Sequence, residues 1–296
     1  MPLEYIPSRP AGRPEFGDVF GGWLTESAGR TFLVDTGLGS GAADMVERLK
    51  ARLGGRNLDC VLLTHIHLDH AGGLGEIFRT WPETLAVVHE KGRRHLAEPD
   101  RLWLKTREVM GELAEVYGRP ASLDPSRLIP HREADWPGLT ILETPGHASH
   151  HLSFRLENTW FVGEAGGCPY LWEGRCYTRP ATPPPFRLEI ALASIDRLLR
   201  EPDGRACFAH TPEKLTLKAV LEAGRRQLAF WNDLLKPRVV PRPGESREAR
   251  LDRLTGLVLR EDPELRPITA MPPAVQWRER LFIRNSVEGF LEHFKV

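Results

Sequence analysis

The stretch LLTHIHLDHAGGL, residues 62–74, carries three histidines and an aspartate within six consecutive positions. Imidazole nitrogens and carboxylates bind divalent first-row metal ions, so this composition points to a metal centre. His65 and His67 are two residues apart, so an extended backbone would direct both side chains to the same side. Asp69 and His70 follow a bend and can face a neighbouring ion. A purely structural cluster is the weaker interpretation, because each buried imidazole would need its own polar partner.

Three more residues of metal-binding type follow apolar runs further along the chain. His147 comes after LTILETPG, Glu164 after HLSFRLENTWFVG, and His210 after RACFA. Loops at strand ends often carry the functional side chains of a protein. With the first cluster, the chain offers seven nitrogen and oxygen donors: His65, His67, Asp69, His70, His147, Glu164 and His210. A set of this size suits two divalent ions.

The elements that would position these donors alternate between strands and helices. Strand patterns are predicted over 19–37 with a turn at 27–30, over 59–64, 85–89, 139–147 and 205–211, and over the hairpin 151–167. Helical apolar spacing predicts helices over 42–53, 91–98, 101–118 and 186–200. Beyond residue 211 the pattern is helical, with Pro-rich joints at 237–243 and 263–273. This order of elements predicts an α/β or α+β protein.

Composition limits the partners of the chain. Hydrophobic residues make up 41% of the 296 residues, charged residues make up 27%, and the formal net charge is zero. This balance gives no support to a nucleic-acid partner. No apolar stretch approaches the roughly 18 residues of a membrane span, and the N-terminal residues lack the apolar core of a signal peptide. The four cysteines show no CxxC spacing, so we expect a cytoplasmic protein without membrane partners.

The motifs resemble those of a known family. HIHLDH resembles the HxHxDH signature of the metallo-β-lactamase superfamily, and LVDTG at 33–37 resembles its early Asp-Thr-Gly. TPGHASHH, FVGEAGG and FAHT resemble its TPGH, acidic strand-end and last-histidine motifs. The resemblance covers about residues 19–211 and implies an αβ/βα sandwich of two mixed β-sheets with outer helices. We therefore predict a catalytic domain at 1–212 and a helical C-terminal extension at 213–296, which caps the site or makes a dimer.

The resemblance also implies how the ligands divide between two metal ions. The first ion would take His65, His67 and His147. The second would take Asp69, His70 and His210. Glu164 stands at the position of the bridging carboxylate, where the family usually has aspartate. The extra methylene lengthens the reach by about 1.5 Å. Three alternatives are therefore open: Glu164 bridges both ions, binds one ion only, or weakens the second site. The expected cofactors are two divalent ions, zinc with iron or manganese as alternatives.

Several other polar and aromatic residues are expected to support the site, to lie at the surface or to contact substrate, without binding metal. Asp35 is expected to support the site rather than bind metal, and His151 to support the fold. Cys168 is not expected to be a ligand. Ordinary surface or pocket positions are expected for His89, His95 and His131. Segment 167–186 is either a substrate entrance or a packed Pro-rich loop. If it is an entrance, the predicted substrate-binding aromatics are Tyr170, Trp172 and Tyr177.

The function that the resemblance implies is a metal-dependent hydrolase of a small ester-type substrate. The motifs are similar to glyoxalase II-like and lactonase-like members, which suggests a thioester or a lactone. Metal ions would lower the pKa of a water from about 16 toward about 7, and Asp69 would act as the catalytic residue that orients the resulting hydroxide. Two alternatives stay open: a mononuclear iron enzyme similar to persulfide dioxygenases, and a non-catalytic binding module. The expected partner is a small-molecule substrate, and a homodimer is left open.

Overall fold

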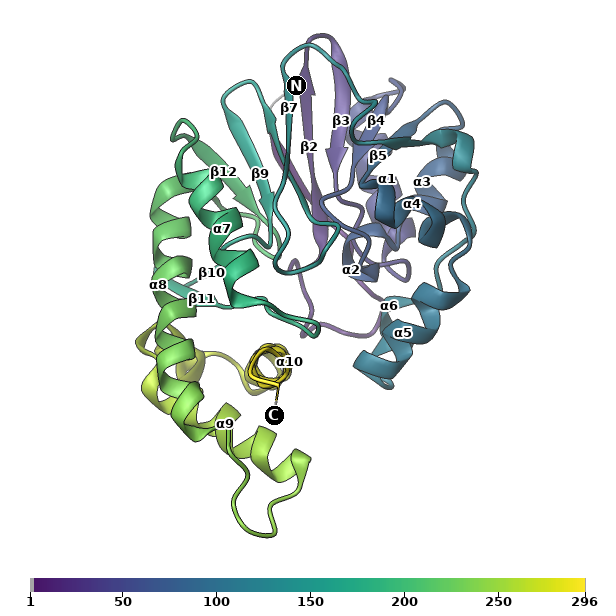
Figure 1. Cartoon of the computed structure of the whole chain (residues 1–296). Helices are drawn as coiled ribbons and strands as arrows, with labels where there is room; N and C mark the ends of the chain where they lie inside the picture. Colours follow the sequence, from purple (N-terminus) through teal and green to yellow (C-terminus); the bar gives the residue numbers. More distant parts are fainter. Residues whose placement is uncertain (1–2, 296) are drawn as a thin grey trace. The chain divides into compact units, whose positions relative to one another are not determined.

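The computed structural model describes residues 3–295 (Figure 1). The chain divides into two compact units. The first unit comprises Met1–Glu143 and Leu152–Gly163, and the second comprises Thr144–His151 and Glu164–Val296. This division differs from the predicted boundary between residues 212 and 213, which stays a prediction.

A six-stranded sheet forms the centre of the first unit. Its strands are β1 (Glu4–Pro7), β2 (Gly21–Ser27), β3 (Arg30–Val34), β4 (Cys60–Leu62), β5 (Leu85–Val88) and β6 (Leu128–Pro130). They lie in sequence order; β1 to β3 pair antiparallel, whereas β3 to β6 pair parallel. Because β4, β5 and β6 run parallel, the residues that follow their carboxyl ends gather at one edge of the sheet. The histidine cluster follows β4, and His89 and His131 follow the other two strands.

Helices accompany this sheet in the first unit (Figure 1). They are α1 (Ala42–Leu53), α2 (Leu68–Ala71), α3 (Leu74–Thr80), α4 (Glu90–Ala97), α5 (Asp100–Met110), α6 (Leu113–Tyr117) and the short 3₁₀ helix η1 (Pro125–Arg127). Apolar side chains at helical spacing on α1, such as Met45 and Leu49, meet Leu33 of β3 in one buried cluster. The bounds of α1 equal the predicted 42–53, whereas the predicted helix 101–118 breaks at Gly111, where φ is +56°.

An antiparallel meander completes the first unit. It consists of β7 (Leu139–Glu143), β8 (Leu152–Leu156) and β9 (Thr159–Gly163). Phe154 pairs with Phe161 across β8 and β9, and both are buried. The turn between these strands falls at 157–158, where it was predicted.

The second unit combines two strand pairs with long helices. The strands are β10 (Cys168–Trp172) paired with β11 (Arg175–Arg179), and β12 (Arg205–Phe208) paired with β13 (Lys214–Thr216). The helices are α7 (Leu188–Leu199), α8 (Leu217–Leu235), η2 (Lys236–Arg238), α9 (Arg247–Glu261), η3 (Pro263–Ala270) and α10 (Pro273–His293). Helices α7 and α8 lie side by side (Figure 1). The sequence did not predict the β10–β11 hairpin, which occupies the segment read as a loop or substrate entrance.

The helical C-terminal extension packs on the β10–β11 hairpin and on the chain that follows it. Arg179 of β11 donates to Glu279 of α10 at 2.9 Å, and Arg278 donates to the same carboxylate at 2.8 Å. All three side chains are buried. Mixed sheets, flanking helices and a helical C-terminal extension confirm the predicted fold class. Among residues 3–295, no helix is long and apolar enough to cross a membrane.

Candidate metal centre

The first unit carries four of the seven predicted ligands, and Asp35 organises them. Its backbone follows β3 in a left-handed conformation with φ of +63°. The Asp35 carboxylate accepts hydrogen bonds from the Thr64 backbone N–H at 2.8 Å and from the Thr64 hydroxyl at 2.8 Å. It also accepts from Nδ1 of His70 at 2.9 Å. Because Nδ1 therefore carries the proton, His70 presents Nε2 as its ligand atom. Asp35 thus contacts a predicted ligand, and its supporting role at a metal site stays a prediction.

Thr64 links Asp35 to His65 by hydrogen bonds and so fixes which nitrogen of His65 carries the proton. The hydroxyl donates its only proton to Asp35, so its oxygen accepts from Nδ1 of His65 at 3.1 Å. His65 therefore presents Nε2, which lies 3.0 Å from Nδ1 of His67. Two nitrogens bound to one tetrahedral zinc lie about 3.3 Å apart, given bonds of about 2.0–2.1 Å. This pair therefore fits a common ion with little adjustment.

Helix α2 starts directly after His67 and presents the other two predicted ligands of the first unit. His67 has an extended backbone, with φ of −60° and ψ of 150°, and Leu68 begins the helix. Asp69 and His70 lie in its first turn, with Asp69 Oδ2 3.8 Å from Nε2 of His70. The bend predicted between the two pairs of the cluster is thus the start of a helix.

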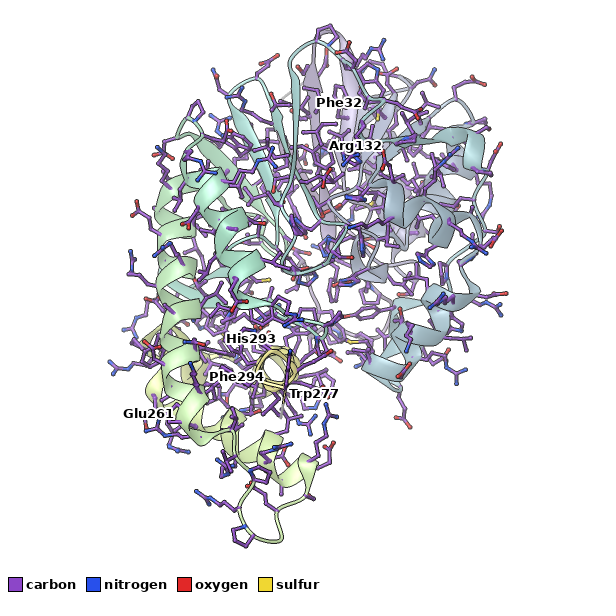
Figure 2. The ribbon with its side chains drawn as sticks, viewed as in Figure 1. Phe32, Arg132, Glu261, Trp277, His293 and Phe294 are labelled. Atoms are coloured by element: carbon purple, nitrogen blue, oxygen red, sulfur yellow. The ribbon has the colours of Figure 1, made fainter. Side chains whose placement is uncertain are left out.

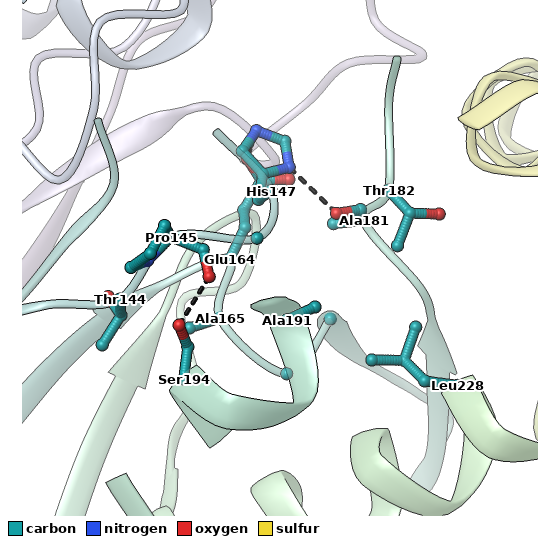
Figure 3. Close-up of a pocket in the computed structure, with 13 residues that line it drawn as sticks. Thr144, Pro145, His147, Glu164, Ala165, Ala181, Thr182, Ala191, Ser194 and Leu228 are labelled. Atoms are coloured by element: carbon teal, nitrogen blue, oxygen red, sulfur yellow. Dashed lines mark hydrogen bonds and ion pairs between the residues drawn. The ribbon is translucent and has the colours of Figure 1, made fainter. Parts of the chain in front are cut away.

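In the second unit, His147 is oriented by a backbone carbonyl. Its Nδ1 donates to the carbonyl oxygen of Ala181 at 3.1 Å, as Figure 3 shows. The ring therefore presents Nε2 as its ligand atom, as metal-binding histidines usually do. Ala181 is held in turn by α10, because the Ser286 hydroxyl donates to the carbonyl of the preceding residue, Pro180, at 2.8 Å. Thr182 also donates from its hydroxyl to the carbonyl of Ser286 at 3.0 Å.

The Glu164 carboxylate lies between two of the predicted ligands. Its Oε2 is 2.8 Å from Nε2 of His147, and its Oε1 is 3.3 Å from Nε2 of His210. Burial raises the pKa of this carboxyl, but His147 and His210 outweigh burial and hold the pKa well below its usual value. The two oxygens of one ionised carboxylate therefore face different histidines, which is the arrangement that a bridging ligand needs.

His151 fixes the backbone of Glu164. Its Nε2 accepts from the Glu164 N–H at 3.1 Å, and its Nδ1 therefore donates to the hydroxyl of Thr144 at 2.9 Å. The imidazole is fully buried, and both of its nitrogens are used within the protein. These two hydrogen bonds support the local fold, as expected of His151, and the expectation that it does not bind metal stays a prediction.

A tight turn brings Cys168 back to Glu164. The Gly167 N–H donates to the Glu164 carbonyl at 3.1 Å, and Gly166 and Gly167 have φ of +95° and +102°. Only glycine adopts such angles readily. The thiol of Cys168 consequently reaches Oε1 of Glu164 at 3.2 Å. Burial raises the pKa of this thiol well above its usual value, so the sulfur is a protonated donor.

A small cavity lies beside these residues in the second unit (Figure 3). His147, Glu164, Ala181 and Ser194 line it, and its volume is about 20 Å³. Such a space holds about one water molecule, so it is too small for a substrate. Two of its lining residues are hydrogen-bonded to each other, because Ser194 on α7 donates to the Pro145 carbonyl at 2.5 Å.

The sequence missed a second cluster in the first unit. His89 and His131 are buried, their rings stack at 4.6 Å, and their Nε2 atoms lie 3.7 and 3.1 Å from the Glu143 carboxylate. Both follow parallel strands, which was the available signal. The donor set resembles a metal site, but Nδ1 of His89 accepts from the Lys91 N–H at 3.1 Å. The proton of a neutral His89 therefore sits on Nε2, which opposes metal binding there. The Arg132 guanidinium (Figure 2) also donates a hydrogen bond to the Glu143 carboxylate at 2.7 Å.

The predicted substrate-binding aromatics lie on the β10–β11 hairpin. Tyr177 is fully buried, which favours a packing role over the predicted place in a substrate entrance. Tyr170 and Trp172 are partly exposed and stack at 6.5 Å. Arg278 lies over the Tyr170 ring at 5.7 Å. A substrate role for Tyr170 and Trp172 stays a prediction.

A family model and curated relatives match this chain. The model described as the metallo-β-lactamase superfamily matches residues 22–210. A metallo-β-lactamase fold-containing protein of Sulfurisphaera tokodaii is 28% identical over 219 residues, which are 71% of this chain and 79% of that protein. A hydroxyacylglutathione hydrolase of Shewanella baltica is 26% identical over 219 residues, which are 71% of this chain and 69% of that protein.

Solved structures share the fold. A crystal structure of an archaeal superfamily protein from Sulfolobus tokodaii aligns with a TM-score of 0.68 at 22% identity, covering 99% of this chain and 98% of the other. A family protein from Thermus thermophilus aligns with a TM-score of 0.62 at 23% identity, covering 99% and 93%. At these identities the likeness concerns the fold alone.

Proposed function

The chain belongs to the metallo-β-lactamase superfamily as a metal-dependent hydrolase, and we propose that it cleaves a small thioester or lactone with two divalent metal ions. The observation that supports two ions is the position of the Glu164 carboxylate. One of its oxygens faces His147 and the other faces His210. In the family pattern these histidines belong to different ions. The Shewanella baltica relative is a hydroxyacylglutathione hydrolase. A hydroxyacylglutathione is a thioester, so this relative supports the proposed substrate class.

The donor set of each unit fits divalent ions. The hydrogen bonds made by His65, His70 and His147 place a proton on Nδ1 and leave Nε2 for metal. We propose seven ligands: His65, His67, Asp69, His70, His147, Glu164 and His210. Zinc is the proposed metal, with iron or manganese as the alternatives that imidazole and carboxylate ligands also accept.

The proposed reaction is addition of water to a carbonyl followed by loss of the thiol or alcohol. Bound divalent ions would supply Lewis-acid polarisation of the carbonyl and acidify the attacking water. Asp69, at the start of α2, would orient that water through its carboxylate, and the proton that the water loses ends on the departing thiol or alcohol. Asp35 keeps the neighbouring His70 in a fixed tautomer throughout. The four free cysteines further support a proposed cytoplasmic, reducing setting.

Metal content per chain tests the proposal most directly. Protein purified without added metal should hold about two equivalents of zinc or manganese and should hydrolyse members of a thioester and lactone panel. Glu164→Asp should keep about two equivalents if the glutamate already bridges. One equivalent of iron, with oxygen consumption on a persulfide, would instead establish the mononuclear dioxygenase alternative.

A matched pair of histidine variants separates catalysis from folding. His67→Ala should lower hydrolysis by at least about 100-fold, because it removes a ligand of the proposed centre. His95→Ala, on α4 and away from the predicted ligands, should keep full activity. No difference between His67→Ala and wild type in any assay of the thioester and lactone panel would favour the non-catalytic alternative.

A further inference from the structure

We propose that Cys168 is a positioning residue that sets the reach of the Glu164 carboxylate and so tunes the affinity for the weaker-bound metal ion. The inference rests on the proposed dinuclear function. It concerns only residues of the second unit, where Cys168, Glu164 and His210 bring their polar atoms together and are all buried.

The contact itself is specific to one carboxylate oxygen. Cys168 donates to Oε1, the oxygen that faces His210, and not to Oε2, which faces His147. A glutamate carboxylate rotates about a broad, nearly two-fold terminal torsion, so nothing within the side chain fixes the plane of its oxygens. A donor on Oε1 removes this freedom on the side of His210. A hydrogen bond to an ionised acceptor is also stronger than one to a neutral acceptor.

Local sequence builds this contact. The turn through Gly166 and Gly167 places Cys168 four residues after Glu164 at the first position of β10. Added Cβ atoms would meet Leu221 at 2.8 Å from Gly166, and the Arg179 carbonyl at 2.7 Å from Gly167. The turn is therefore packed on both sides and holds the thiol in place. An aspartate at 164 would be shorter by about 1.5 Å and would draw its carboxylate away from the sulfur.

A double-mutant cycle tests this coupling. The variants are Cys168→Ala, Glu164→Asp and the double variant, and the readout is the zinc affinity of the weaker position, measured by competition with a chelator. Cys168→Ala should weaken this affinity about tenfold in the wild-type background, the scale of losses seen when a ligand's supporting partner is removed. In the Glu164→Asp background the same change should alter affinity less than about twofold.

Two further variants control for packing and for chemistry. Cys207→Ala removes a buried thiol on β12, 1% exposed, and should leave zinc affinity unchanged. Cys168→Ser keeps a hydroxyl donor and should retain more affinity than Cys168→Ala. Thermal unfolding of each metal-free variant checks that the fold is kept.

Three results would overturn the proposals, and they differ from one another. Equal losses from Cys168→Ala in both backgrounds would show that Cys168 does not act through Glu164. A thiolate-to-metal charge-transfer band in the cobalt-substituted wild type, lost in Cys168→Ala, would make Cys168 a ligand instead. Wild type that binds only one zinc ion would overturn the dinuclear function itself, whereas the first two results leave that function intact.

Discussion

At the scale of single residues, hydrogen bonds around the predicted ligands decide which ring nitrogen each histidine offers. Asp35 fixes His70 directly and fixes His65 through the Thr64 hydroxyl. One carboxylate thus orients two predicted ligands. The left-handed backbone of Asp35 is uncommon for a residue with a Cβ, and such conformations persist where surrounding structure requires them.

Replacing Asp35 should therefore weaken metal binding without removing a ligand. Asp35→Asn replaces one acceptor oxygen with a donor group, so the three hydrogen bonds to Thr64 and His70 cannot all form. We expect metal affinity to fall about 10- to 100-fold, measured by chelator competition. Asp59→Asn is the control, because Asp59 accepts from the Thr31 N–H and contacts no predicted ligand. Unchanged affinity in Asp35→Asn would contradict the role assigned to Asp35.

Glu143 predicts a pH dependence of stability. The hydrogen bond from Arg132 lowers the pKa of this carboxyl from 4.5 to about 2, and His131 adds to the effect. The folded state therefore binds fewer protons than the unfolded state between these values, so the stabilisation is complete above about pH 4.5 and disappears as pH falls toward 2. Urea unfolding of Glu143→Gln should show a shallower acid loss of unfolding free energy than wild type. Parallel curves for the two proteins would refute this assignment.

At the scale of elements, the C-terminal helices support the part of the second unit that holds His147 and Glu164. Helix α8 approaches the Gly166 turn so closely that a Cβ on Gly224 would lie 1.9 Å from the Gly166 carbonyl oxygen. Helix α10 makes a similar approach at Gly289, where a Cβ would lie 1.9 Å from the Thr182 carbonyl oxygen. Glycine at these helical positions is required by close packing, even though it lowers helix propensity.

Two glycine variants test this packing. Gly224→Ala should lower the free energy of unfolding by about 1–3 kcal/mol, because the methyl group meets backbone that cannot move aside easily. It should also lower metal affinity, because the Gly166 turn carries Glu164. Gly256→Ala on α9 should instead raise stability by about 0.5–1 kcal/mol, because the nearest atom to its Cβ is a flexible Arg260 side chain at 3.6 Å. Thermal unfolding of both variants provides the comparison, and a neutral Gly224→Ala would refute the close contact.

At the scale of the whole molecule, a cluster of buried charged side chains connects the helical C-terminal extension to the β10–β11 hairpin. Glu279 accepts from Arg179, which lies 100 residues earlier, and from its neighbour Arg278. The side chains of Arg179 and Glu279 are 6% and 4% exposed. Removing one member of such a cluster costs far more than its formation contributes, because the remaining charges stay buried.

Glu279→Ala should consequently destabilise the protein by about 3–5 kcal/mol. The control is Glu288→Ala on the same helix, whose partner Arg247 is 59% exposed. Because exposed ion pairs are screened by water, that change should cost less than about 1 kcal/mol. Chemical denaturation measures both, and similar small losses would mean that the extension does not depend on the cluster.

The sequence by itself determined the family, the order of most strands and helices, and the identity of the candidate ligands. These features depend on residue type and short spacing, as in HIHLDH after an apolar strand or the apolar rows of 42–53. Charge and composition likewise follow from counting residues.

Tertiary structure alone decided how side chains distant in sequence orient one another. Asp35 pairs with His70, which lies 35 positions later, and Arg179 bonds to Glu279, which lies 100 positions later. Tyr177 is fully buried, although its sequence suggested a place in a substrate entrance. The β10–β11 hairpin also escaped prediction, because its strands pack against the later helices rather than showing a regular apolar alternation. Such contacts depend on how the whole chain packs, and no local pattern encodes them.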